Sequence, residues 1–266
     1  MDPLPDGLLV SGCNLSGVPT VAGQSAIGYE LTDADADGDT GSATVHVSVD
    51  PVDAPVQVGT CQPGAALSFA GSVPGSVDPG DAFGEVSATG DFDGDGFDDL
   101  AIGVPGEDSN GRTNDGTVIV LYGSPGGIKR GPGEMWNQRG PRPGKPQTGD
   151  RLGSSLAAGD FDRDGNDDLL IGVPGEDVRG KKDAGAVMVF YGTDAGLSGA
   201  GATAWKQYGS LAGKHERRDR LGASLSAGDF NGDGFDDAVF AATGEDVNGR
   251  ADAGMVHILF GAKKGL

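Results

Sequence analysis

The stretch GDFDGDGFDDLAIGVPGED, from Gly90 to Asp108, places five Asp residues among its first ten positions and then continues as an apolar strand. Carboxylates packed this closely repel one another unless a cation lies among them. The stretch returns as GDFDRDGNDDLLIGVPGED at 159–177 and as GDFNGDGFDDAVFAATGED at 228–246. A repeated acidic turn is therefore the feature from which the fold can be predicted.

The repeat has a period of 69 residues, which is the spacing of Asp91, Asp160 and Asp229, and the same shift places Trp136 on Trp205. Each period shows short apolar runs separated by turns rich in Gly, Pro, Asp and Asn. In the first period the predicted strands are 83–90, 99–104, 117–123 and 134–138. Four antiparallel strands per period, without helical periodicity, predict an all-β fold built from propeller blades.

Short motifs around the acidic turns resemble FG-GAP repeats. These motifs are AFG at 82–84, RLG at 151–153 and 220–222, and GVPG after the first two turns. FG-GAP repeats build the seven-bladed propeller of integrin α subunits and of related bacterial surface proteins. The resemblance covers about residues 64–266 and implies a partial propeller of about three four-stranded blades. Two departures concern packing: Leu152 and Leu221 stand where the motif has Phe, and ATG at 242–244 replaces Gly-x-Pro.

Residues 1–57 differ from the repeats, so we predict two domains, 1–57 and 58–266. Tyr29–Pro55 alternates apolar and polar residues across an acidic turn, as a β-hairpin does. The segment resembles the later strands of a bacterial cadherin-like or immunoglobulin-like module, which implies a partial β-sandwich. Its turn, Asp33–Asp39, has Gly41 where a closing Asp would stand, which favours a plain turn over a fourth calcium site. Cys13 and Cys61 either form one bridge or remain two thiols.

The acidic turns have the pattern expected of a calcium site. Carboxylates at alternate positions lie on the inside of one curl, and Gly96 permits the sharp bend between them. Hard oxygen ligands without His or Cys favour calcium, about three ions in all. An EF-hand would need Glu at the twelfth position, where Ile102 stands. The alternative is a set of metal-free turns held by Asx hydrogen bonds.

The predicted ligands follow the turn positions. They are Asp91, Asp93, Asp95, the Phe97 carbonyl and Asp99 in the first turn (91–99); Asp160, Asp162, Asp164, the Asn166 carbonyl and Asp168 in the second (160–168); and Asp229, Asn231, Asp233, the Phe235 carbonyl and Asp237 in the third (229–237). Because Asn231 replaces a carboxylate, we expect the third turn to bind calcium most weakly.

Other repeated residues lie outside this ligand pattern. Asp98 and its copies are interpreted as turn or edge residues, and Trp136 and Trp205 as packing between blades. Glu107 and Asp108, with their copies, either bond the backbone of the following loop or bind a cation or ligand. The first of these two readings is favoured.

The charge of the chain limits its partners. Asp and Glu number 40 against 19 Lys and Arg, and this net charge of −21 disfavours nucleic acid and anionic membrane. Antiparallel blades place the acidic turns at one end and the second-to-third-strand and blade-to-blade loops at the other. That other end, the basic end, holds Arg112, Arg139, Arg142, Lys145, Arg151, Arg179, Lys181, Lys182, Lys214, Arg217, Arg218, Arg220 and Arg250. These bases either recognise an acidic protein or sugar or are simply solvated.

No catalytic pattern is evident, so we expect the chain not to be an enzyme. His46, His215 and His257 do not recur with the repeat, and no nucleophile elbow, phosphate loop or His-Glu-x-x-His pair occurs. The resemblance implies a secreted or cell-surface, calcium-binding propeller that mediates adhesion or binds a protein or glycan. The alternative is a passive spacer or accessory domain of a larger secreted polypeptide, such as a hydrolase. We expect the export signal, and any further blades, to come from outside this chain or from another chain.

Overall fold

The computed structural model describes residues 80–125, 127–129, 133–139, 144–208 and 211–266, together with four short strands nearer the N-terminus. The chain divides into two compact units, Met1–Ser68 and Phe69–Leu266. In the first unit, β1 (Leu8–Ser11) pairs with β2 (Asn14–Gly17) and β3 (Tyr29–Glu30) pairs with β4 (Ser42–Ala43), both antiparallel. The predicted domain boundary at residue 57, the two cysteines and the rest of the predicted β-sandwich lie outside the described residues.

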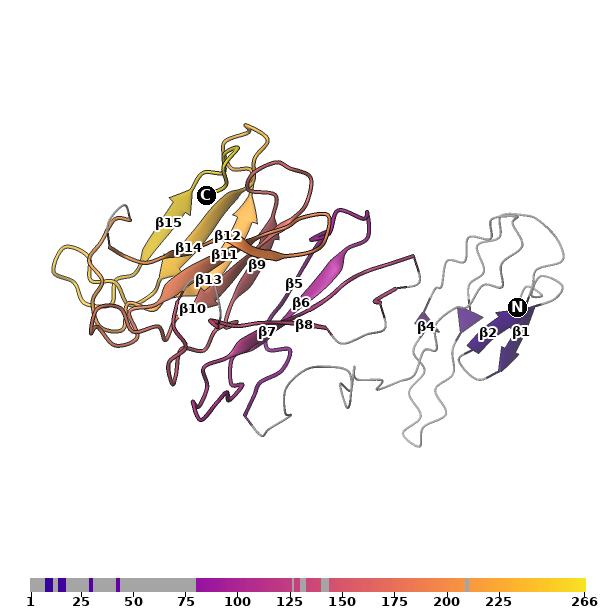
Figure 1. The fold of residues 1–266 in the computed structure, drawn as a ribbon, viewed down its shortest axis with the longest axis horizontal. Helices are drawn as coiled ribbons and strands as arrows, with labels where there is room; N and C mark the ends of the chain where they lie inside the picture. The colour runs from indigo at the N-terminus through magenta and orange to yellow at the C-terminus, as the bar shows by residue number, and fades with distance from the viewer. Residues whose placement is uncertain are drawn as a thin grey trace. The chain divides into compact units, whose positions relative to one another are not determined.

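The second unit contains three antiparallel sheets, shown in Figure 1. The first comprises β5 (Ser87–Gly90), β6 (Asp99–Val104), β7 (Thr117–Leu121) and β8 (Glu134–Trp136); the second β9 (Leu156–Gly159), β10 (Asp168–Val173), β11 (Ala186–Tyr191) and β12 (Ser198–Trp205); the third β13 (Leu221–Gly228), β14 (Asp237–Ala242) and β15 (Met255–Leu259). Strands follow chain order within each sheet, so each is one meander. The predicted all-β fold of propeller blades is confirmed, and the described residues contain no helix that could span a membrane.

Each acidic turn joins the first two strands of a blade in the same register. Gly90 pairs with Asp99, Gly159 with Asp168, and the third blade repeats the pair with Gly228 and Asp237. The first strands lie toward one another, since β9 contacts both β5 and β13. This is the arrangement expected of the inner strands of a propeller.

Apolar side chains fill the space between successive blades. Val118 and Trp136 of the first blade join Ile171 and Phe190 of the second in one buried cluster. The Trp136 and Phe190 rings meet edge to face with their centroids 4.9 Å apart, a favourable aromatic geometry. Trp205, which is partly buried, packs against the cluster between the second and third blades. The predicted role of both Trp residues in packing between blades is confirmed.

The outer face of the third blade is exposed in the described structure. Val187 is fully buried between the second and third blades, whereas Val256, one period later, is 63% exposed. Ile258 and Phe260 on the same strand face are exposed as well. The same repeat position therefore lies in a core in the second blade and at the surface in the third.

Glycine in the second strand allows the next blade to approach. A Cβ at Gly103 would lie 2.2 Å from the Gly153 carbonyl oxygen, and one at Gly172 would lie 2.1 Å from the Gly222 oxygen. Both distances are far inside van der Waals contact, and the atoms concerned are backbone, so only Gly fits. In the third blade this position is Ala241.

Candidate metal centres

The first acidic turn is shaped by its own leading carboxylate. The Asp95 N–H donates to Asp91 Oδ1 at 3.0 Å and the Gly96 N–H donates to Asp91 Oδ2 at 2.9 Å. Gly96 has φ +87°, which a residue with a side chain rarely adopts. In the second turn Asp164 and Gly165 donate to Asp160 in the same way. The Asx hydrogen bonds of the metal-free alternative are thus present, and they leave other carboxylates directed into the curl.

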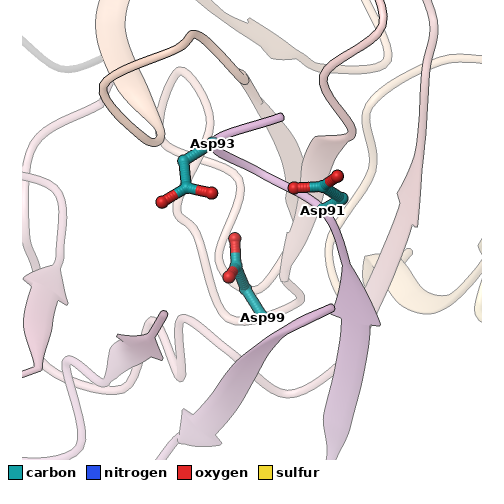
Figure 2. A group of neighbouring side chains, drawn as sticks. All are labelled: Asp91, Asp93 and Asp99. Atoms are coloured by element: carbon teal, nitrogen blue, oxygen red, sulfur yellow. The ribbon is translucent and has the colours of Figure 1, made fainter. Parts of the chain in front are cut away.

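Three carboxylates of the first turn converge on one point, as Figure 2 shows for Asp91, Asp93 and Asp99. One oxygen from each lies within 4.8 Å of the others. The second turn brings together Asp160, Asp162 and Asp168 to the same degree. Residues at positions one, three and nine of the pattern therefore meet in both turns. The predicted ligands at position five, Asp95 and Asp164, lie outside these groups of three.

Several oxygens in the turns are buried without a hydrogen-bond partner among the described residues. They are Asp93 Oδ1 in the first turn and Asp162 Oδ1 and Asn166 Oδ1 in the second. Burial raises the pKa of Asp162, and the nearby carboxylates of Asp164 and Asp160 raise it further. Buried polar atoms are normally paired, and an uncompensated cluster of carboxylates is unfavourable. The donor set, all hard oxygens, fits calcium.

The Asp at position nine also joins the strands of its blade. Asp99 Oδ2 accepts a hydrogen bond from the Phe92 N–H at 2.8 Å, and its Oδ1 accepts one from the Gly123 N–H at 2.7 Å. Asp168 and Asp237 bond the equivalent backbone groups in their blades. Burial raises the pKa of Asp168 to about 8. This residue, predicted as a closing ligand, therefore has a structural role as well.

The third turn differs from the first two. Asp229 accepts hydrogen bonds from the N–H groups of Gly232, Asp233 and Gly234. The Asn231 side-chain amide donates to Asp233 Oδ2 at 2.9 Å, so this carboxylate oxygen has a hydrogen-bond partner within the turn. Asn231 stands at position three, where the first two turns have the convergent carboxylates of Asp93 and Asp162. The third turn therefore offers one carboxylate fewer at the positions that converge in the other two.

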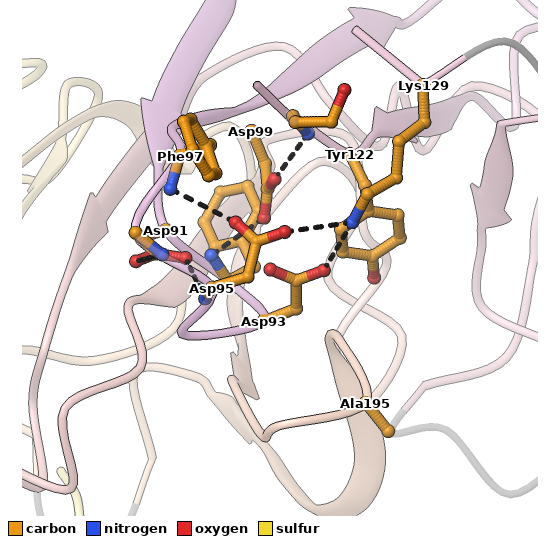
Figure 3. A network of polar contacts seen from close by, with 12 residues as sticks. Asp91, Asp93, Asp95, Phe97, Asp99, Tyr122, Lys129 and Ala195 are labelled. Atoms are coloured by element: carbon orange, nitrogen blue, oxygen red, sulfur yellow. Dashed lines mark hydrogen bonds and ion pairs between the residues drawn. The ribbon is translucent and has the colours of Figure 1, made fainter. Parts of the chain in front are cut away.

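A lysine from another part of the blade reaches into the first turn (Figure 3). Lys129 Nζ lies 3.0 Å from Asp93 Oδ2 and 3.1 Å from Asp95 Oδ2. The hydrogen bond from Lys129 lowers the pKa of Asp95. The pattern of the repeat did not predict this contact, because position 198 of the second copy holds Ser instead of Lys.

Asp167 and Asp236 connect the turns of neighbouring blades. Asp167 Oδ2 accepts a hydrogen bond from the Asp91 N–H at 2.9 Å, and the Asp167 N–H donates to the Asp91 carbonyl at 2.8 Å. Asp236 makes the same pair of bonds to Asp160. The interpretation of these residues as turn or edge residues was incomplete. Each one holds the first predicted ligand of the preceding blade, Asp91 or Asp160.

The acidic residues after each second strand have structural partners. Asp108 Oδ1 accepts a hydrogen bond from the Asn114 N–H at 2.8 Å. Asp177 and Asp246 accept the equivalent bond in their blades. The prediction that these residues bond the backbone of the following loop is therefore confirmed for the Asp of each pair. Glu176 accepts a hydrogen bond from Gln138 Nε2 at 2.7 Å, across the blade junction. Glu245 and Gln207 repeat that contact. The recurrence of Gln at the 69-residue spacing was the signal that sequence reasoning missed.

Comparison with known proteins agrees with the geometry of the blades. Residues 83–121, 152–190 and 221–259 match the FG-GAP repeat family. These three segments run from the start of each blade to the end of its third strand. Each match therefore includes one complete acidic turn.

Similarity to individual proteins extends beyond the three matched segments. The chain is 33% identical over 200 residues to integrin alpha pat-2 of Caenorhabditis briggsae, covering 70% of this chain and 14% of the relative. It is 33% identical over 204 residues to integrin alpha-PS2 of Drosophila melanogaster, covering 74% and 13%. It is 32% identical over 159 residues to phosphatidylinositol-glycan-specific phospholipase D of Mus musculus, covering 60% and 18%. The chain thus spans less than a fifth of the length of each of these relatives.

Proposed function

Because the chain belongs to the FG-GAP repeat family, we propose that it is a calcium-stabilised propeller module of a secreted or cell-surface protein. The observation that carries the proposal is the convergence of Asp91, Asp93 and Asp99, repeated one period later, around buried oxygens that lack a partner among the described residues. Calcium bound there would offset the repulsion between these carboxylates and hold the first two strands of each blade together.

Ligand binding is the proposed task of the module. Integrin alpha chains are among its relatives, and the calcium turns occupy one end of the blades. The bases of the opposite end favour an acidic protein or glycan as the ligand, at a cell surface or in the matrix. The bound ions have a structural role in this proposal, and the chain itself performs no reaction.

A second candidate is an accessory domain of a larger secreted polypeptide. The specific observation that favours it is the similarity to phosphatidylinositol-glycan-specific phospholipase D. In that case the blades would serve as a rigid spacer or positioning domain beside a catalytic domain. The calcium turns would keep the same structural role in both candidates.

Thermal unfolding in calcium and in a chelator tests the calcium sites. A ligand bound only by the folded state stabilises it by about 2.7 kcal/mol at a concentration 100-fold above its dissociation constant. Extracellular calcium modules bind at about 0.1 to 1 mM, so about 10 mM calcium, which is roughly 10- to 100-fold above that range, should raise the melting temperature by several degrees. Asp162→Asn should remove one ion from the calorimetric stoichiometry. Asp194→Asn, an exposed acid on the same end, should not. A melting temperature unaffected by calcium contradicts the proposal.

A further inference from the structure

The ammonium group of Lys129 contacts two of the acids that are predicted to bind calcium in the first turn. Its Nζ is within hydrogen-bond distance of Asp93 Oδ2 and Asp95 Oδ2, at 3.0 and 3.1 Å, and Figure 3 shows it directed between the two carboxylates. Both residues are predicted calcium ligands. One positive charge therefore already offsets part of the repulsion within this turn.

The backbone of Lys129 is anchored by a hydrogen bond, while its side chain is partly exposed to water. The Lys129 N–H donates to the Tyr122 carbonyl at 2.7 Å, which attaches the residue to the end of β7. Its Nζ lies 5.7 Å from the centroid of the Tyr122 ring. The side chain is 46% exposed, and a lysine stem is long and flexible. The ammonium group can therefore leave the carboxylates for water without disturbing its backbone anchor.

The second turn provides a comparison within the same chain. One period after Lys129 the residue is Ser198, and the described residues include no ion pair to the carboxylates at 160–168. Arg163, which belongs to this turn, directs its Nη1 to the Asp233 carbonyl of the third turn at 3.3 Å. The first and second turns share the same pattern of convergent carboxylates. Among the described residues, an ammonium group pairs with the acids of the first turn, at Asp93 and Asp95, and none pairs with those of the second.

We propose that Lys129 is a tethered competitor for calcium at the first turn, an inference that rests on the proposed calcium binding. A divalent cation and an ammonium group cannot both lie among the same carboxylates without strong repulsion. Calcium must therefore displace Lys129 from Asp93 and Asp95. As a result, the first turn fills at a higher calcium concentration than the second, and it keeps a bound cation when calcium is low.

A calcium titration followed by NMR resolves the two turns in one protein. The amide signals of Asp95 and Gly96 report the first turn, and those of Asp164 and Gly165 report the second. Because Lys129→Gln removes two exposed ion pairs, it should lower the half-saturation concentration of the first turn by about three- to tenfold. The second turn should be unchanged. Lys129→Arg, which keeps the cation, should behave as the wild type does.

Lys181→Gln is the control for net charge, because Lys181 is exposed in the loop between β10 and β11, at the opposite end of the blade. It should leave the half-saturation of both turns unchanged. An equal gain in affinity from this variant would mean that overall charge, not the tethered group, governs the first turn. That result would overturn the inference.

Unfolding in a chelator supplies a second readout. In the chelator, Lys129→Gln should have a lower melting temperature than the wild type, because its first turn has lost its only nearby cation among the described residues. Its melting temperature should then rise more than that of the wild type when calcium is added. A purely packing role for Lys129 would lower the melting temperature equally in both conditions.

The outcomes separate the inference from the proposed function. If the second turn binds calcium while Lys129→Gln leaves the first turn unchanged or weaker, the inference is wrong and calcium binding stands. If no amide in either turn responds to calcium, the proposed function fails, and the inference fails with it.

Discussion

At the scale of single residues, buried carboxylates are the most consequential feature of this chain. Asp150, at the end opposite the acidic turns, is fully buried. Its Oδ2 accepts a hydrogen bond from the Gln147 N–H at 2.6 Å. Burial raises its pKa from the ordinary 3.8 to about 7, and the neighbouring Glu176 and Asp177 carboxylates add to the shift. Ionisation of this residue therefore opposes folding at neutral pH.

The raised pKa of Asp150 predicts a pH dependence. Between pH 3.8 and about 7 the folded state holds a proton that the unfolded chain has released, so the free energy of unfolding falls as pH rises through this window. Asp150→Asn cannot ionise, and its amide oxygen can still accept the backbone bond. Denaturant unfolding at pH 5 and pH 8 should show the variant gaining stability relative to the wild type at pH 8. A difference independent of pH would contradict this assignment, and Asp194→Asn serves as the exposed control.

At the scale of elements, the turn of one blade is held by the turn of the next. The two backbone and side-chain bonds between Asp167 and Asp91 fix the N-terminal end of the first acidic turn. The proposed calcium site needs this curl, so we expect its affinity to depend on a residue of another blade.

A substitution in the second turn should therefore weaken calcium binding in the first. Asp167→Ala leaves the Asp91 N–H without its acceptor, which costs about 1 to 3 kcal/mol where the group is buried. Unfolding by denaturant should show a loss in the lower part of that range, since the site is only partly buried. The first-turn amides should also need more calcium to shift. Asp98→Ala is the matched control, because Asp98 is exposed in the first blade. Equal effects of the two variants would refute the link between blades.

The sequence predicted elements better than it predicted the contacts between them. The bounds of β6 are those expected from its apolar run, and the turn register follows from the repeat. The first strand was predicted from residue 83, whereas β5 begins at Ser87. Residues 83–86 form a turn and a bend, which the apolar pattern of the sequence does not distinguish from a strand. The pairing of Asp167 with Asp91 depends on how two blades pack. Lys129 was missed because no second copy marks it as part of the site.

At the scale of the whole propeller unit, acidic and basic side chains are concentrated at opposite ends of the blades. The acidic turns and Lys129 lie at one end, and the loops joining second to third strands lie at the other with most of the bases. Arg179 there lies over the Tyr208 ring at 4.3 Å, a contact that holds two loops of this end together. A rigid set of sheets thus presents loops that can vary without disturbing the acidic turns.

This division predicts which end binds an acidic ligand. Reversing Arg217, Arg218 and Arg220 to Glu should weaken retention on heparin and binding to cell surfaces, with no fall in the melting temperature, because all three are exposed. The matched control reverses Lys263 and Lys264, which are exposed beyond β15 at the end of the acidic turns. If the control loses binding and the triple variant keeps it, the ligand binds at the end of the acidic turns and the prediction is wrong.

The burial of one repeat position depends on the blade that packs against it. Val187 is fully buried in the cluster between the second and third blades, so a charged side chain there would disrupt a core. Val256 occupies the same repeat position in β15, where no following blade is described, and it is 63% exposed. Tolerance to substitution is therefore set by the neighbouring blade, and a consensus averaged over the three copies does not carry that information.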